Sequence, residues 1–525
     1  MEPVGRFQQV TVDKDLFSVT WELASGRGAR QKAQDLTLTL AKRAAGGGKV
    51  HAIALTDSPG GHPALAAEML GAEIARLGIE PLVHLTCKDK NRNQMEGILH
   101  GLERASVKNL LAITGDYNCS GFMGQAKPVF DLDPIHLLTL ISSLNHGLEI
   151  PSGSGSMRLH PCHFFAGAVA NPFKMEEAEL LAQYFKLEKK LRAGARFIVS
   201  QLGYDARKFQ ELLMIVRFMG FADVPVLGNI FILPLRAAQF MNRGGLPGCM
   251  APDKLVSVLE GESKAADKGK SGSLDRAARM YAFMKGMGFS GVHIGGHGVS
   301  YEDVEFVVGR GEELASNWQD LLPEFDFPQP DGFYYFVRDS RTGLNADVPV
   351  DRARSRPSGS LTYKTFHSLH RAAFDPGGIL FKPMRAIAME VEGGTWEGAY
   401  ARIEHLCKVV SNECQCCGDC ALIDLAYLCP MSQCPKSQRN GPCGGSSKGY
   451  CEVYPKGSRG QRKCLFVRAY KRLETHCAEH QLGAYQLPPL NHALRGSSSW
   501  LNFYLGRDHS AGRLGILKRN PEGVP

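Results

Sequence analysis

The sequence predicts an α/β protein: a (β/α)₈ TIM barrel followed by a smaller cysteine-rich metal-binding domain. Three observations lead to this fold class. The chain has 525 residues, enough for a barrel of roughly 250 residues with additions. Its first 310 residues alternate apolar runs and helix-like segments at intervals of roughly 30 residues. Eight of its fifteen cysteines fall between Cys414 and Cys451.

Eight short runs rich in β-branched and apolar residues are the predicted barrel strands. They are residues 17–23, 49–56, 80–87, 109–116, 162–170, 195–202, 224–231 and 289–296. Helix-like segments such as 62–78 and 175–194 lie between them, and Gly194 is a suitable C-terminal stop. Strands that alternate with helices imply parallel βα units, and eight such units fit a closed barrel.

A doubly wound sheet is the alternative to the barrel. Such a sheet usually opens with a glycine-rich phosphate turn, G-x-G-x-x-G, after its first strand. Here the first run continues into ELASGRGAR (22–30), which does not have that pattern. The barrel is therefore favoured.

The chain divides into four predicted regions. They are the barrel (1–315), a connecting region (316–400), a cysteine-rich metal or iron–sulfur module (401–480) and a C-terminal extension (481–525). The longest apolar run, VPVLGNIFILPL (224–235), is shorter than the roughly 20 residues of a membrane helix. The N-terminus has no apolar signal-peptide core. We expect a cytoplasmic protein that does not enter a membrane.

Polar residues follow six of the predicted strands. In a barrel the carboxyl ends of the strands form the face that carries the active site. The residues at these ends are Glu22, Thr56–Asp57, His84–Cys87, Thr114–Asp116, Asn171 and Gln201. One polar strand end is commonplace, but six in register predict a functional pocket.

These strand ends and their flanks resemble the methylenetetrahydrofolate reductase family over about residues 15–310. The stretches that carry the resemblance are VTWEL, PLVHLTCKDKNR, NLLAITGD, VFDLD, GAVANPF, LEKKLRAGARFIVSQLGYD and GVHIGG. The later pattern CxxCGDC…LCPMSQCPK…NGPCGG…CEV resembles the module fused to or partnered with such reductases in some bacteria and acetogens. Two separate regions thus indicate one family.

The resemblance implies a flavin-dependent barrel, with FAD or FMN, that reduces 5,10-methylenetetrahydrofolate to 5-methyltetrahydrofolate in one-carbon metabolism. Hydride would come from the reduced flavin. Glu22 matches the family's general acid, which protonates N10 so that the substrate can open. Asp116 matches the aspartate that contacts folate and influences the flavin, and Gln201 matches the glutamine that contacts the pterin ring.

Three further residues match flavin-site positions of the family: Thr56, His84 and Lys190. For His84 the alternative is a buried histidine bonded to backbone, and for Lys190 it is an ordinary surface lysine. The family often has Pro-Pro where this chain has Ala24-Ser25, and an aspartate where it has Gln183. The second departure leaves the choice between FAD and FMN open, and the sequence identifies no nicotinamide pocket.

The cysteine spacing predicts metal binding rather than disulfides in a reducing compartment. Cys414, Cys417 and Cys420 repeat the x₂ spacing of bacterial ferredoxins. The predicted ligands are Cys414, Cys417, Cys420, Cys429, Cys434, Cys443, Cys451 and Cys464. They suit one or two [4Fe–4S] clusters, with structural Zn²⁺ as the alternative.

The positive charge is concentrated in the cysteine-rich region. Between Lys436 and Arg472 there are ten Lys and Arg residues and one acid, whereas residues 1–435 carry a net charge of −2. With iron–sulfur clusters, this run would suit docking of an acidic electron carrier such as ferredoxin. With zinc, the module would brace the barrel, and NAD(P)H would supply the hydride.

Two other functions compete with the reductase. One is a barrel repurposed for folate-dependent methyl transfer or demethylation, with a structural zinc module. The other is a metal-stabilised nucleic-acid-binding protein, which we do not expect because the basic run has neither interleaved aromatic residues nor a zinc-finger histidine pair. A homo-oligomer is compatible with the sequence.

Overall fold

The computed structural model describes residues 4–153, 155–352 and 361–516. These form two compact units. Unit 1 comprises residues 1–351 together with the hexapeptide 443–448. Unit 2 comprises residues 352–442 and 449–525.

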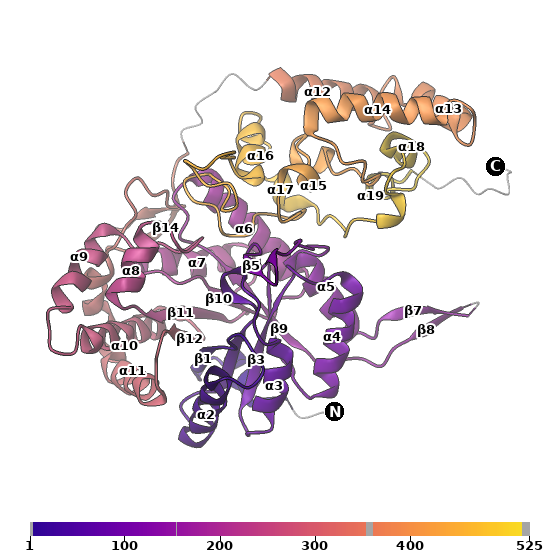
Figure 1. Ribbon diagram of the computed structural model, residues 1–525. Coiled ribbons are helices and arrows are strands. Elements are labelled where there is room, and N and C mark those ends of the chain that lie inside the picture. Colours follow the sequence, from indigo (N-terminus) through magenta and orange to yellow (C-terminus); the bar gives the residue numbers. More distant parts are fainter. Residues whose placement is uncertain (1–3, 154, 353–360, 517–525) are drawn as a thin grey trace. The chain divides into compact units, whose positions relative to one another are not determined.

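Unit 1 is built on a closed barrel of eight parallel strands (Figure 1). Around the barrel the order is β1-β12-β11-β10-β9-β4-β3-β2. The strands are β1 (Ser18–Ala24), β2 (Ala52–Thr56), β3 (Glu80–Thr86), β4 (Asn109–Ile113), β9 (Phe165–Ala170), β10 (Phe197–Ser200), β11 (Val226–Ile232) and β12 (Gly291–Gly296). Each lies within or overlaps one predicted run, so the predicted TIM barrel is confirmed.

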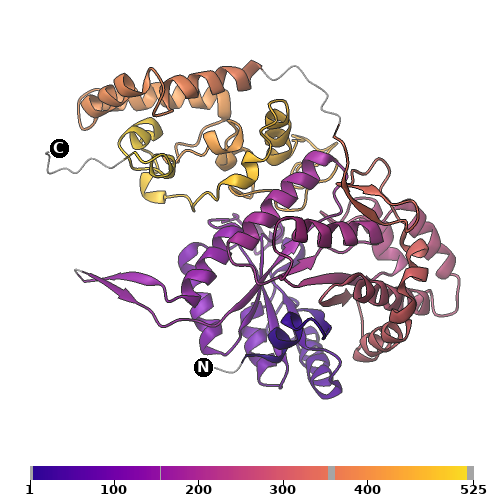
Figure 2. The same cartoon turned by 180° about the vertical axis from the view of Figure 1, so that it is seen from behind.

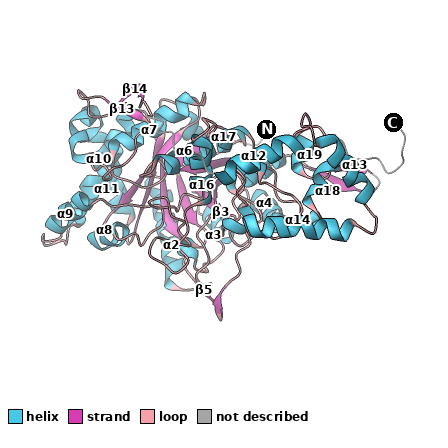
Figure 3. Cartoon of the chain, turned by 90° about the horizontal axis from the view of Figure 1, so that it is seen from above, coloured by secondary structure: helices cyan, strands magenta, loops and turns pink. Residues whose placement is uncertain are grey.

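Helices surround the barrel, as the views from behind and from above show (Figures 2 and 3). They are α1 (Arg6–Val12), α2 (Lys32–Gly47), α3 (Ala67–Ala75), α4 (Arg92–Arg104), α5 (Pro134–Asn145), α6 (Glu177–Arg192), α7 (Ala206–Phe218), α8 (Leu235–Asn242), α9 (Asp253–Glu262), α10 (Lys270–Met287) and α11 (Tyr301–Leu314). Side-chain caps begin several of them. For example, the Asp133 carboxylate accepts hydrogen bonds from the backbone of Ile135 and His136 at the start of α5.

The interior of the barrel is filled by side chains from alternate strand positions. Phe7, from α1, is fully buried and packs edge-on against Phe165 and Phe197, with ring centroids 5.9 and 5.6 Å away. These three residues share one apolar cluster with Leu82, Leu111 and Leu227. Helix α1 therefore adds an aromatic residue to the barrel core.

Strands β1 and β12 pair to close the barrel, and their register determines which side chains lie together near the polar strand ends. Thr20 lies opposite His293 and Trp21 opposite Ile294. Successive strand residues point to opposite faces, so Thr20 and Glu22 share one face, whereas Trp21 points the other way, toward the ring of Tyr301 on α11. The period of two thus places Glu22 on the same face as Thr20.

After α11 the chain of unit 1 continues through a 3₁₀ segment and a small hairpin. The segment is η2 (Ala315–Phe325), and the hairpin strands are β13 (Phe336–Arg338) and β14 (Asn345–Pro349). Two further hairpins are β5–β6 (Ser120–Gly121, Gly124–Gln125) and β7–β8 (Glu149–Ser152, Gly155–Arg158). The Arg207 guanidinium lies 3.9 Å from the ring centroid of Tyr334 and donates to Asn345, so the β13–β14 region is held to α7.

Unit 2 is mainly helical. Its elements are α12 (Leu361–Ala373), α13 (Phe381–Val391), α14 (Glu397–Asn412), η3 (Ile423–Leu425), α15 (Pro430–Gln433), α16 (Leu465–Glu474), α17 (Gln481–Ala484), η4 (His492–Leu494), α18 (Ser499–Tyr504) and α19 (His509–Arg513). An apolar cluster joins Phe381 and Ala388 of α13 to Leu501, Phe503 and Tyr504 of α18. Within the described part of the chain, no helix is long and apolar enough to span a bilayer.

Replacing Phe7 with alanine should destabilise the barrel. The substitution removes a fully buried ring from between two aromatic partners, so the free energy of unfolding should fall by about 3–5 kcal/mol. Urea denaturation of the full chain measures this change. Phe122→Ala is the matched control because the Phe122 side chain is 89% exposed, and equal losses in the two variants would contradict the packing role of Phe7.

Candidate functional site

Three titratable side chains meet at the carboxyl ends of β1, β3 and β12. One carboxylate oxygen of Glu22 and one ring nitrogen each of His84 and His293 lie within 4.8 Å of one another. Glu22 Oε2 is 3.2 Å from His293 Nε2, and the rings of His84 and His293 have centroids 5.9 Å apart. His293 is 2% exposed, whereas the Glu22 side chain is 32% exposed. Glu22 is therefore the member of the group that solvent or a ligand can reach.

The environment of Glu22 favours its ionised form. Burial opposes the charge, but the hydrogen bond and charge of His293, helped by His84 and His297, outweigh it and hold the Glu22 pKa below its usual value. Burial lowers the pKa of His84 to about 4, so this second imidazole is neutral near pH 7. A carboxylate thus faces one neutral histidine and one histidine within hydrogen-bond reach.

Two residues predicted at flavin-site positions each have a buried polar atom with no hydrogen-bond partner among the described residues: Thr56 Oγ1 and His84 Nε2. Orphaned buried groups of this kind are rare in proteins and point to an external ligand. The alternative for His84 was a buried histidine bonded to the backbone. His84 is buried, but among the described residues its Nε2 has no hydrogen-bond partner. Gln183, which stands where the family has an aspartate, also has an orphaned Nε2.

Asp57 follows β2 and ties neighbouring strand ends together. Its Oδ2 accepts hydrogen bonds from the backbone and hydroxyl of Thr86, at 3.0 and 2.7 Å, and from Lys90. Burial raises the Asp57 pKa, but the Lys90 ammonium and the Thr86 donors outweigh burial and lower it. Asp57 is therefore an ionised link between neighbouring strand ends, a role that the sequence did not indicate.

Asp116 and Gln201 are only partly buried at their strand ends. Asp116 Oδ2 accepts from the backbone of Gly60 at 2.7 Å, and Gln201 Oε1 accepts from the backbone of Leu202 at 2.9 Å. Gly115, just before Asp116, has φ +85°, and a Cβ there would meet Thr86 Cβ at 2.8 Å. Glycine at 115 thus lets the chain turn so that Asp116 reaches the Gly60 loop.

Cys249 links Glu22 and Asp116 electrostatically. Burial raises the pKa of this thiol to about 12; Lys174 lowers it, and the charges of Asp116 and Glu22 raise it. Both carboxylates therefore act on the same buried atom.

Lys190, on α6, is buried, which excludes the alternative of an ordinary surface lysine. Its ammonium donates to the backbone carbonyl of Val169 on β9. Burial, together with the nearby Lys186, lowers the pKa of Lys190 to about 7. The side chain is thus held at a strand end and its charge changes near neutral pH.

Four of the predicted metal ligands line one pocket in unit 2: Cys414, Cys417, Cys420 and Cys429. The same pocket is lined by Glu404, His405 and Lys408. Lys408 Nζ lies 3.7 Å from Cys420 Sγ. Burial raises the Cys417 pKa to about 12, and the neighbouring Cys420 and Cys429 add to the shift. Neighbouring buried thiols resist ionisation because each thiolate charge disfavours the next. A bound metal cation removes this obstacle and converts the thiols to thiolates.

A second group of thiols consists of Cys434, Cys451 and Cys464. Burial raises the pKa of Cys464 to about 12, with Cys434 as the next cause and Cys451 as a further one. Backbone hydrogen bonds join the segments that carry two of them, since Cys451 N donates to Arg462 O and Cys464 N to Gly449 O. The predicted ligands of unit 2 thus fall into a group of four and a group of three.

The eighth predicted ligand, Cys443, belongs to the hexapeptide 443–448 of unit 1. Two potential ligands outside the predicted set of eight lie beside the group of four. Cys416 Sγ is 2.7 Å from His405 Nδ1, and both can converge with Cys414 on one ion. A histidine eleven residues before the cysteine gave no recognisable spacing signal.

Comparison with known proteins identifies the family. The model described as methylenetetrahydrofolate reductase matches residues 6–296, which is more than half of the chain. The chain belongs to the methylenetetrahydrofolate reductase family. A second model, described as the C-terminal part of methylene-tetrahydrofolate reductase, matches residues 395–493. Both regions that carried the resemblance are thus confirmed as family regions.

Among relatives of the family, methylenetetrahydrofolate reductase 2 of Saccharomyces cerevisiae is 25% identical over 202 residues. That alignment covers 37% of this chain and 30% of the yeast protein. An uncharacterized Clostridium thermocellum protein described as binding two copies of 5-methyl-5,6,7,8-tetrahydrofolic acid has a TM-score of 0.39 and 11% identity, over 57% of this chain and 95% of its own. Yersinia pestis DHPS has a TM-score of 0.33 and 10% identity, over the same shares.

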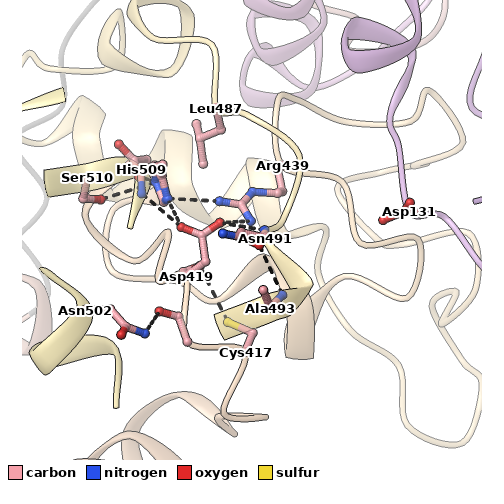
Figure 4. Close-up of polar contacts among 12 residues, drawn as sticks. Asp131, Cys417, Asp419, Arg439, Leu487, Asn491, Ala493, Asn502, His509 and Ser510 are labelled. Atoms are coloured by element: carbon pink, nitrogen blue, oxygen red, sulfur yellow. Dashed lines mark hydrogen bonds and ion pairs between the residues drawn. The ribbon is translucent and has the colours of Figure 1, made fainter. Parts of the chain in front are cut away.

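A buried network of charges stands next to the group of four cysteines. Figure 4 shows Asp419, which follows Cys417 by two positions, between His509 and Arg439. His509 Nδ1 lies against Asp419, and its Nε2 is 3.0 Å from Asp424 Oδ2; Arg439 is 3.2 Å from Asp419. Burial opposes a charge on His509, but the two carboxylates outweigh burial and raise its pKa. His509 is thus a buried cation that holds the C-terminal helix α19 to the cysteine loop.

The basic run from Lys436 to Arg472 is only partly a surface feature. Lys436 is buried against Glu452, and Arg439 is buried against Asp419. Arg472 donates to the backbone carbonyl of Ala426. Several of the charges counted in the sequence therefore stabilise unit 2 internally, and fewer remain for docking a carrier.

The His509 network predicts a pH-dependent stability. A histidine whose folded pKa is raised stabilises fully below its unfolded pKa of about 6.5, and this contribution is lost as pH rises through the folded pKa. His509→Gln should therefore lower the free energy of unfolding by about 3–5 kcal/mol near pH 6, with a smaller difference at alkaline pH. Chemical denaturation of the full chain from pH 6 to 9 measures both. The exposed His480→Gln is the control, and a pH-independent difference would contradict the buried imidazolium.

Proposed function

We propose that this chain is a flavin-dependent reductase that converts 5,10-methylenetetrahydrofolate to 5-methyltetrahydrofolate in one-carbon metabolism. Membership of the family supports the reaction class. The observation that carries the proposal is Glu22, a carboxyl group near the end of β1 that is partly exposed and hydrogen-bonded to His293. General acid catalysis requires an accessible, positioned proton donor, and a carboxyl group can serve as one.

The residues present fit a flavin. The orphaned Thr56 Oγ1 and His84 Nε2 offer polar atoms that an isoalloxazine ring can satisfy, and Lys190 offers a cation for the ribityl or phosphate part. Gln183 replaces a family aspartate with a neutral amide, which suits either FAD or FMN. When bound, the flavin supplies the hydride.

Three side chains act on the folate in this proposal. Glu22 donates a proton to N10, so that the substrate opens to the iminium form that accepts hydride. Asp116 and Gln201, held by Gly60 and Leu202, bind the pterin and orient it. Because these groups are fixed by backbone hydrogen bonds, little reorganisation is needed when the substrate binds.

We further propose that unit 2 holds iron–sulfur centres, which would pass single electrons to the barrel from a donor such as ferredoxin. Support comes from the pocket lined by four cysteines, three of which have x₂ spacing, and from a separate second thiol group. Cys443 is the remaining proposed ligand. If the metal is zinc, the module is structural and NAD(P)H is the donor.

Glu22→Gln should suppress folate turnover while leaving flavin reduction intact. The amide keeps the shape of the side chain but cannot donate the proton, so reoxidation of the reduced enzyme by methylenetetrahydrofolate should slow by about 10²–10⁴-fold. Stopped-flow measurement of the two half-reactions separates the effects. Glu73→Gln, an exposed change on α3, should match the unmodified chain.

Equal loss of both half-reactions in Glu22→Gln would refute the acid role. A purified chain that binds no flavin would refute the reductase, and flavin binding without folate turnover would favour methyl transfer or demethylation.

Cysteine substitutions should distinguish one centre from two. In anaerobically purified protein we expect iron and acid-labile sulfide, and Cys417→Ser or Cys464→Ser should each remove about half of the iron. Elemental analysis with visible spectroscopy measures this, and the exposed Cys407→Ser is the control. Stoichiometric zinc without sulfide would refute the iron–sulfur proposal, and total iron loss from either single variant would contradict two independent centres.

A further inference from the structure

Behind Glu22 runs a short chain of hydrogen-bonding groups formed by β1 and β12. Glu22 Oε2 is 3.2 Å from His293 Nε2, and His293 Nδ1 is 2.8 Å from Thr20 Oγ1. Thr20 Oγ1 is also 3.4 Å from the backbone oxygen of Val292. Thr20 is completely buried and His293 nearly so, which leaves Glu22, whose side chain is 32% exposed, as the accessible end of the chain.

The direction in which the Thr20 hydroxyl donates its single proton decides which nitrogen of His293 is protonated. If it points to Val292 O, then Thr20 Oγ1 accepts from His293 Nδ1–H, and Nε2 is free to gain or lose a proton at Glu22. If it points to Nδ1, then Nε2 must carry a proton and donate it to the Glu22 carboxylate. Both arrangements satisfy every group of the chain. In the first, Nδ1 keeps its own proton, so a second proton can move along the Nε2–Oε2 contact without leaving a buried atom unpaired.

The surroundings of Glu22 create a conflict with its proposed role. A general acid must be protonated when the substrate reacts. Burial raises the pKa of Glu22, but His293 and the other histidines nearby outweigh burial and hold this pKa below its usual value. The proton must therefore be available from a neighbouring group. The other titratable or charged groups around the pair are His84, His297, Asp57, Cys249 and Lys174.

None of these other groups is as well placed as His293. Burial lowers the pKa of His84 to about 4 and raises that of Cys249 to about 12, so neither exchanges a proton readily near pH 7. Asp57 is engaged by Thr86 and Lys90. Lys174 donates to the backbone oxygen of Ser446. His293 is the titratable group hydrogen-bonded to Glu22.

We propose that His293 is a positioning residue that stores the proton delivered by Glu22, with Thr20 orienting its ring. This inference rests on the proposed reductase function. The His293 Nε2–H bond breaks as the Glu22 Oε2–H bond forms, and Glu22 then gives this proton to N10 of the folate. The imidazole regains one proton from solvent in each cycle, so protons balance and no additional oxidant or reductant is required.

A shared proton changes the pH dependence of the reaction. Two groups in hydrogen-bond contact titrate as a pair, and activity is lost when the last shared proton leaves. With His293 present, two sites hold the shared proton, so activity persists until both have lost it. Without His293, the proton is held by Glu22 alone and is lost at lower pH.

The test uses the flavin-loaded full chain and follows one half-reaction. The chemically reduced enzyme is mixed anaerobically with 5,10-methylenetetrahydrofolate, and flavin reoxidation is recorded from pH 5 to 9. In His293→Gln, which keeps a donor but cannot titrate, we expect reoxidation at pH 7.5 to slow at least about 10-fold and to recover as pH falls. The descending limb of the pH profile should move down by about one pH unit or more.

Substitutions of Thr20 provide a second, milder test. Thr20→Val keeps the shape but removes the hydroxyl, and should shift the limb in the same direction by a smaller amount. Thr20→Ser restores the hydroxyl and should restore the profile. His51→Gln is the matched control, because His51 is bonded to the backbone of Val19 on the same strand but has no contact with Glu22 among the described hydrogen bonds.

The outcomes separate this inference from the function on which it depends. If the unmodified enzyme is not reoxidised by the folate, the proposed function fails. If it is reoxidised and Glu22→Gln blocks the step, but His293→Gln and Thr20→Val keep the original pH profile, the proton-storing role is overturned. If His293→Gln does not bind flavin, the Thr20→Val and Thr20→Ser pair decides, since a shift reversed by serine is not expected from a merely structural residue.

Discussion

The closure of the barrel between β1 and β12 is the constraint on which the proposed chemistry depends. It joins residues 271 positions apart in sequence, Glu22 and His293, through a register that sets Thr20 opposite His293. A shift of one residue would turn Glu22 to the helix-facing side and Trp21 into the barrel. The same register brings β2 and β3 alongside, so that Thr56 and His84 present their unsatisfied polar atoms at the same end. Packing of the apolar interior and placement of the polar site are therefore consequences of one set of strand pairings.

Much of the barrel could be predicted from the sequence because each strand is a local feature, a short β-branched run before a helix. The polar strand ends followed from the same reasoning, since parallel strands bring their carboxyl ends to one face. The role proposed for His293 could not be predicted from the sequence. Its significance depends on Glu22, which lies on the adjacent strand but 271 positions earlier in the sequence, where His293 is one histidine inside an apolar strand. Asp57 was likewise placed at the rim without a role, because its partners Thr86 and Lys90 belong to the next βα unit.

In unit 2 the sequence was informative about ligand type but not about grouping. The x₂ spacing of Cys414, Cys417 and Cys420 brings them to one pocket, but Cys429 joins them only through the fold. The basic run shows a further limit, because counting charges does not distinguish exposed from buried ones. Lys436 and Arg439 contribute to the net charge of that run, yet both are buried against carboxylates.

Buried cations lie next to the cysteines of unit 2 and determine the electrostatics around them. A group of neighbouring thiolates in a low-dielectric interior repel one another, and a bound metal centre compensates only part of their charge. Lys408 lies beside Cys420. Burial raises the pKa of Cys434, Cys451 and Cys417, and nearby cations oppose this rise: Lys436 at the first two thiols and Arg439 at the third. Each cation is in turn paired with a carboxylate: Glu404, Glu452 or Asp419. The thiols and their counter-ions therefore form one coupled system. Binding of the proposed metal would change the charge balance of these buried pairs and would thus be linked to the stability of unit 2.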